Sequence, residues 1–164
     1  MGLDITVNTG LIPCALHGDA DAAYDARHVY LTVYPELFPE RTLPIKDGCY
    51  QYVEEFDFRA GSYSGYNRWR EQLSRFALGV PPETVWGNPE YIGKPFYELI
   101  EFSDCEGFIG PAIAEKLSRD FQQHTQDAIK WANQYADGGY WLQKYHDWMK
   151  AFRLASDNGV VRFH

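Results

Sequence analysis

The chain has 164 residues, a formal net charge of −8 and a charged share of 23%, an ordinary balance for a globular protein. This length fits one domain, 1–164, whose core is large enough to fold without disulfides or metals. The negative charge excludes the usual kind of nucleic-acid-binding protein, which needs a broad basic face, so we expect no direct nucleic-acid partner.

The N-terminal half is predicted to be rich in β-strands. Apolar patterning predicts a short strand over 3–7 and another over 28–34, which ends before a proline. Prolines and an Asp-Gly pair predict a loop over 35–48. Aromatic residues then alternate with polar ones from Tyr50 to Phe58, which predicts a further strand with its rings on one face.

Shorter helical segments follow this half. Apolar residues recur at spacings of three and four from Tyr66 to Phe76, which predicts a helix that begins at about residue 66 and ends at Gly79. A connector rich in proline and glycine occupies 80–95. A proline at the end of the connector predicts a short helix that runs to Phe102.

Two longer helices are predicted in the C-terminal part. Apolar spacing predicts one helix over 110–135 and another over 140–156, and their aromatic residues are expected to form a core between them. Residues 160–163 are expected to return as a closing edge strand. The order predicts an α+β fold, in which an antiparallel β-rich N-terminal half packs against three to four C-terminal helices.

Residues 58–76 reverse the charge of the chain locally, with four arginines against one acid. Glycines, serines, tyrosines and an asparagine lie between the arginines, just before the first predicted helix. Guanidinium groups, hydroxyls, helix N–H groups and aromatic faces together can hold an anionic, ring-bearing small molecule. The alternative interpretation is a strand-to-helix turn with a serine cap and solvated arginines.

Each residue type in this segment has an expected role. Arginines would hold a phosphate or carboxylate, serines would cap the helix or donate hydrogen bonds, and tyrosines would stack on a ring. The predicted binding residues here are Arg59, Ser62, Tyr63, Ser64, Tyr66, Asn67 and Arg70.

A second candidate segment, FSDCEG at 102–107, precedes the first long helix. Asp104 and Glu106 are expected to accept hydrogen bonds from hydroxyl or amino groups of the ligand. They flank Cys105 and disfavour its thiolate, so a nucleophilic cysteine is the weaker hypothesis. His124 falls on an apolar helix stripe and is expected to be a core residue.

The chain contains three cysteines, an odd number at wide spacings that does not indicate a disulfide framework. No leader pattern and no apolar run of about 18 residues is evident, so we expect a cytoplasmic protein without a membrane partner. Cys14 and His17 have the spacing of a zinc half-site, but a second half-site is lacking. We therefore expect neither a metal nor a cofactor.

Three stretches resemble a family of proteins from tailed bacteriophages and prophages to which no activity is assigned. They are GLDIT at 2–6, RAGSYSGYNRWRE at 59–71, and FSDCEG at 102–107 together with the closing DNG and FH. The resemblance implies a small accessory protein in the host cytoplasm. It also implies that one site gathers Asp4, Arg59, Ser62, Tyr63, Asn67, Arg70, Asp104, Glu106 and Asp157.

These observations favour a non-enzymatic binder of a nucleotide-like anion that sequesters a host immune signal, with no catalytic residue assigned. A second hypothesis is an inhibitor of a host defence protein that uses an acidic and aromatic surface. A third is a small enzyme acting on the same kind of ligand. A homo-oligomer with pockets formed across subunits fits the surplus of aromatic residues, 16% of the chain.

Overall fold

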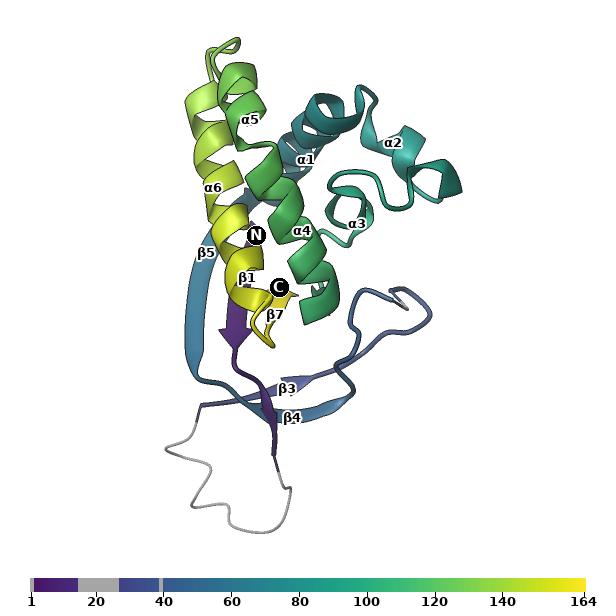
Figure 1. Cartoon of the computed structure of the whole chain (residues 1–164), viewed down its shortest axis with the longest axis vertical. Coiled ribbons are helices and arrows are strands. Elements are labelled where there is room, and N and C mark those ends of the chain that lie inside the picture. The colour runs from purple at the N-terminus through teal and green to yellow at the C-terminus, as the bar shows by residue number, and fades with distance from the viewer. Residues whose placement is uncertain (1, 15–26, 39) are drawn as a thin grey trace.

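The computed structural model describes residues 2–14, 27–38 and 40–164, and over these it confirms the predicted α+β fold (Figure 1). An antiparallel sheet with strand order β5-β1-β7-β6 packs against helices from the C-terminal part. Its strands are β1 Gly2–Thr9, β5 Glu54–Ser62, β6 Gly107–Ile109 and β7 Val160–Phe163. Among the described residues, no helix combines the length and the apolar composition that a membrane span requires.

The closing strand β7 is confirmed, but it does not lie at the edge of the sheet. It pairs with β1 on one side and with β6 on the other. The sequence reading missed β6 because it has only 3 residues, too few for an alternating pattern to be visible.

A second, smaller sheet has the order β2-β4-β3. Its strands are β2 Ile12–Pro13, β3 His28–Leu31 and β4 Gly48–Gln51. The single strand predicted from Tyr50 to Phe58 is wrong, because β4 and β5 belong to different sheets. The chain changes sheet at Tyr52, whose N–H donates to Arg27, and at Val53, whose N–H donates to Thr9.

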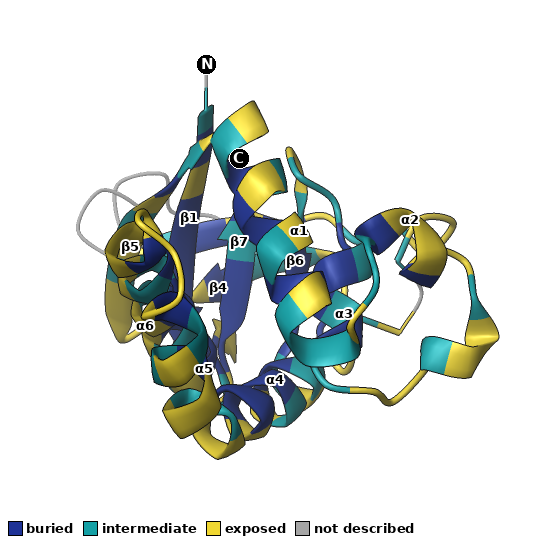
Figure 2. Ribbon diagram, turned by 90° about the horizontal axis from the view of Figure 1, so that it is seen from above, coloured by how far each residue is buried: buried dark blue, intermediate teal, exposed yellow. Residues whose placement is uncertain are grey.

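The two faces of the larger sheet carry different cores. Ile5 pairs with Phe58 and Phe163, and all three side chains face the helices. Phe108 and Val160 point to the other face, where they join the apolar cluster of the small sheet. The larger sheet therefore lies between the helices and the small sheet, and β1 and β7 are buried over most of their length (Figure 2).

The helices begin and end largely where local signals predict. The helical segments are α1 Tyr63–Leu78, α2 Pro82–Val85, η2 Pro89–Tyr91, α3 Tyr97–Glu101, α4 Pro111–Gln123, α5 Thr125–Ala132 and α6 Gly138–Ala155. Helix α1 ends at Gly79, which has a left-handed φ of 73° that favours glycine. The connector over 80–95 contains α2 and η2.

The long helix predicted over 110–135 is two helices that meet at His124. The carbonyl of Phe121 accepts hydrogen bonds from the hydroxyls of Thr125 and Tyr145, both at 2.7 Å. Such side-chain bonds to a helix carbonyl bend or interrupt a helix. The ring of His124 packs near Phe76 and Phe96, but it is half-buried and lies beside the core rather than within it, which corrects the prediction of a core residue.

Candidate functional site

The charge-reversed segment crosses from β5 into α1, and Ser62 fixes the point where the helix begins. The Oγ of Ser62 accepts the N–H of Gly65 at 3.0 Å and lies 3.2 Å from the Oγ of Ser64. This confirms the predicted serine cap and explains why α1 starts at Tyr63 rather than at residue 66.

We expect Ser62→Ala to lower the free energy of unfolding by about 1 kcal/mol, because it removes the N-cap of α1. Ser64→Ala is the matched control, since the described residues give the Ser64 hydroxyl only the contact with Ser62. Urea denaturation of both variants measures the difference. Equal losses in the two variants would show that the cap does not stabilise the helix.

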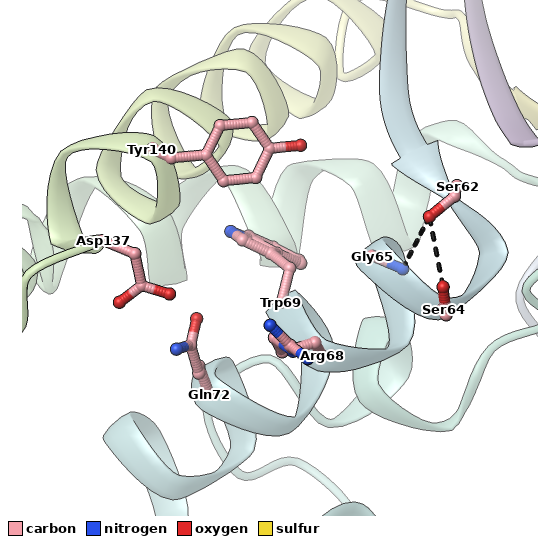
Figure 3. Close-up of a pocket in the computed structure, with 8 residues that line it drawn as sticks. All are labelled: Ser62, Ser64, Gly65, Arg68, Trp69, Gln72, Asp137 and Tyr140. Atoms are coloured by element: carbon pink, nitrogen blue, oxygen red, sulfur yellow. Dashed lines mark hydrogen bonds between the residues drawn. The ribbon is translucent and has the colours of Figure 1, made fainter.

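A first cavity of about 310 Å³ lies between α1 and the start of α6. Figure 3 shows the side chains of Arg68 and Gln72 from α1 and of Asp137 extending toward the same space. The lining residues are Ser62, Ser64, Gly65, Arg68, Trp69, Gln72, Asp137 and Tyr140.

A second, larger cavity of about 540 Å³ lies between α1, α2 and the 102–107 segment. Its lining residues are Ser64, Asn67, Arg68, Arg70, Glu71, Pro82, Glu83, Trp86 and Asp104. Ser64 and Arg68 line both cavities and so connect them.

The larger cavity brings together four of the predicted site residues, Ser64, Asn67, Arg70 and Asp104. The Nδ2 of Asn67 donates to the Oδ2 of Asp104 at 2.9 Å. The Oδ1 of Asn67 accepts from Arg70 at 2.6 Å. Asn67 therefore links the buried arginine to the carboxylate and holds both in place.

Arg70 does not fit the anion-holding role predicted for it. Its residue is only 6% exposed, and its NH1 donates to the carbonyl of Phe102 at 2.6 Å. The guanidinium also lies over the rings of Tyr66 and Trp86, at 5.3 and 5.5 Å from their centroids. Arg70 therefore connects α1 to α2 and to the 102–107 segment. It contributes to the wall of the larger cavity, but its guanidinium is occupied by contacts within the protein.

Tyr66 does not fit the stacking role predicted for it, because it belongs to the core. Its residue is fully buried, and its ring stacks on Trp69 and tilts against Trp148. Burial raises the pKa of Tyr66 far above its ordinary value, so its phenol is neutral. Tyr63 is half-buried against the same core and lines neither cavity.

The remaining predicted residues lie away from both cavities. Asp4 and Arg59 form an ion pair at 3.2 Å on the sheet face that points away from the helices. Glu106 lines neither cavity, and Asp157 lines a separate one beside Thr9. The single gathering that the resemblance implies is therefore wrong for these four residues, because alternation along β5 turns Arg59 away from α1.

The cavities contain residues that the sequence reading did not assign to the site. Arg68 is exposed, and it has no hydrogen-bond or ion-pair partner among the described residues. Trp86 is 44% exposed, yet its Nε1 donates to the carbonyl of Ile100 at 3.0 Å. The ring of Trp86 is therefore fixed in place while part of it faces solvent. Tyr140, 55% exposed, supplies a second ring in the smaller cavity.

The sequence carried a partial signal for these residues. The local excess of arginine included Arg68. Only the contacts in the folded structure distinguish Arg68 from the other three arginines, which have partners. Trp86 lies in the connector over 80–95, and nothing in its local pattern relates it to α1.

Cys105 is not among the residues that line the two cavities. Cys105 is exposed, and its Sγ lies 3.6 Å from the hydroxyl of Ser103. The described residues contain no group of three His, Cys, Asp or Glu side chains that could hold a metal ion. His17, the partner considered for Cys14, lies outside the described residues.

Comparisons with protein-family models, with curated proteins and with solved structures found no match. The resemblance to phage proteins therefore stays a prediction, and functional inference depends on the geometry of the two cavities.

Proposed function

We propose that this protein binds a nucleotide-like anionic small molecule in the two cavities at the start of α1. The observation that carries this proposal is the position of Arg68. Arg68 lines both cavities, and its guanidinium has no partner among the described residues, so its charge is available to a ligand. Ser64, which also lines both, places a hydroxyl at the helix N-terminus, where an anion is favoured.

The other lining groups match the remaining parts of such a ligand. The fixed ring of Trp86 offers a stacking surface for a base in the larger cavity. The carboxylate of Asp104, held by Asn67, accepts hydrogen bonds from hydroxyl or amino groups. Volumes of about 310 and 540 Å³ fall within the range typical of small-molecule sites.

The biological role that we propose is sequestration of a host immune signal by a phage-encoded protein in the host cytoplasm. The resemblance of the 59–71 and 102–107 segments to phage proteins supports this role by association. The chemistry of the cavities supports it independently, because nucleotide signals carry phosphates, rings and hydrogen-bond donors together.

Isothermal titration calorimetry with ADP-ribose, a cyclic dinucleotide and inorganic phosphate tests the proposal. We expect binding of at least one nucleotide and weaker binding of inorganic phosphate, which lacks a ring. Arg119→Gln is a control, because Arg119 is an exposed helical arginine paired with Glu115 and lines neither cavity. Absence of heat with every nucleotide would contradict the proposal.

We expect Trp86→Ala to weaken nucleotide binding by about 5-fold to 150-fold, because stacking of a base on an aromatic ring is lost. Tyr135→Ala is the matched control, since Tyr135 is similarly exposed, at 45%, and lines neither cavity. The same calorimetric titration measures both variants. An unchanged affinity of Trp86→Ala would remove Trp86 from the site.

An inhibitor of a host defence protein is a second candidate function, which a separate cavity of about 530 Å³ lined by both apolar and charged residues favours. Leu37 and Ile92 line this cavity and are 52% and 65% exposed. This function predicts a stable complex with a host protein that survives Arg68→Gln but not Ile92→Asp. Affinity capture with both variants separates the two functions.

An enzyme acting on the same ligand is the third candidate, and the fate of the ligand distinguishes it from a binder. Mass spectrometry of the small molecules released by heat denaturation gives the answer. Recovery of the intact nucleotide supports sequestration, and recovery of fragments supports turnover.

A further inference from the structure

Cys14 and Cys49 meet in the small sheet although they are 35 residues apart in the sequence. Cys14 directly follows β2, and Cys49 lies in β4, which pairs antiparallel with β2. The N–H of Cys14 donates to the carbonyl of Cys49 at 2.9 Å, so the two residues face each other across the ladder. The sequence spacing did not indicate this pairing, because only the register of β2 on β4 creates it.

The two thiols are close enough to be joined with little movement. Their Sγ atoms lie 2.7 Å apart, which is closer than the roughly 3.5–4.0 Å of an ordinary contact between non-bonded heavy atoms. Facing residues of an antiparallel pair have Cα atoms about 4.5–5.5 Å apart, within the range that a disulfide spans. The backbone therefore already has the geometry that a disulfide between these residues needs.

We propose that Cys14 and Cys49 are a site of reversible disulfide formation that clamps β2 onto β4. Strand β2 has only 2 residues, one of them a proline, so it makes few backbone hydrogen bonds of its own. A covalent link beside it would hold the strand against β4, whose Tyr50 belongs to the apolar cluster of the small sheet. This inference is independent of ligand binding at α1.

The reaction proceeds by thiol–disulfide exchange with a low-molecular-weight disulfide. One cysteine gives up its proton and attacks the external disulfide, which forms a mixed disulfide and releases one small thiol. The second cysteine then gives up its proton and displaces the second small thiol. The protein loses two hydrogens and is oxidised, and the external disulfide is reduced to two thiols.

The environment of Cys14 favours its thiol form over the thiolate. Burial, and then the hydrogen bond and charge of Cys49, raises the pKa of Cys14 to about 11. In a reducing compartment both residues remain thiols, as they are in this structure. Cys105 is exposed and belongs to another part of the chain, so it serves as an internal control.

The test is incubation of the full-length protein with oxidised glutathione, followed by blocking of free thiols and mass spectrometry. We expect wild type and Cys105→Ser to lose about 2 Da through the 14–49 link, and a digest to contain the linked peptide. Cys14→Ser and Cys49→Ser should not form it. Glutathione carried separately on Cys14 and Cys49, or two unreacted thiols, would overturn the proposal.

A thermal unfolding measurement on the same oxidised samples tests the clamp separately from the link itself. Oxidation should raise the Tm of wild type and of Cys105→Ser by roughly 5 °C or more, because closing the 14–49 loop restricts the unfolded chain. Cys49→Ser should show no such rise. A linked protein with an unchanged Tm would contradict the clamp.

Discussion

Replacing Trp148 with alanine is expected to lower the free energy of unfolding by about 3–5 kcal/mol. Trp148 is fully buried between the larger sheet and the helices. Its indole contacts rings from β5, α1, α6 and β7, namely Phe58, Tyr66, Trp69, Phe152 and Phe163. Alanine would leave a cavity at the point where these four elements meet, and rigid rings cannot collapse to fill it.

Trp148→Phe is the matched control for this prediction. The indole Nε1 of Trp148 is buried and has no hydrogen-bond partner among the described residues. Phenylalanine therefore removes volume but breaks no hydrogen bond, and we expect a loss of about 1–2 kcal/mol. Urea denaturation at equilibrium measures both variants. A loss in Trp148→Phe as large as in Trp148→Ala would show that the indole N–H stabilises the fold.

The features of the fold that the sequence predicted correctly are those with local causes. Ser62 caps α1 through an atom three residues away, and Gly79 ends it because glycine accepts a positive φ. Some aromatic residues of the later helices also behave as predicted, whereas Tyr135 and Tyr140 are 45% and 55% exposed. Trp141 and Tyr145 are buried between helices, and helical spacing alone places them on one face.

The features that the sequence did not predict depend on contacts between distant residues. The break at His124 involves a local bond from Thr125 and a second bond from Tyr145, which reaches the carbonyl of Phe121 from another helix. The change of sheet at Val53 follows from its bond to Thr9, at the end of a different strand. Tyr145 and Thr9 both lie outside the segments whose patterns predicted the helix and the strand.

At the candidate site, too, the sequence predicted what depends on neighbouring residues and missed what depends on distant contacts. Charge reversal in 58–76 located the region, because that signal is a property of neighbouring residues. It did not separate the four arginines, since some of their partners come from elsewhere in the fold. Arg59 pairs with Asp4, and Arg70 bonds the carbonyl of Phe102. The pair of Arg75 with Glu71, one turn away, follows a spacing visible in the sequence.

The sequence contains one further signal, the alternation of apolar and polar residues before the first helix. Strand β5, Glu54–Ser62, precedes the helix, so its alternate side chains point to opposite faces. Phe58 and Ala60 face the helical core, which forces Arg59 to the other face. Strand alternation thus separates Arg59 from Arg68, whereas charge alone groups them.

Replacing Arg68 with glutamine is therefore expected to weaken nucleotide binding by about 10-fold to 150-fold, the range for losing a charged hydrogen bond. Glutamine keeps a polar side chain of similar reach but removes the positive charge that both cavities share. Isothermal titration calorimetry against the nucleotide with the highest affinity for wild type measures the change. The melting temperature should stay close to that of wild type, because Arg68 has no partner to lose among the described residues.

Arg59→Gln is the decisive control, because it removes the same charge from the same segment but on the other face of the sheet. Its ion pair with Asp4 joins side chains that are 58% and 55% exposed, and such pairs contribute little to stability. We expect its nucleotide affinity to stay within about 2-fold of wild type. The opposite pattern, in which Arg59→Gln weakens binding and Arg68→Gln does not, would move the ligand to the exposed sheet face. Equal losses in both variants would indicate attraction by net charge rather than a contact within the cavities.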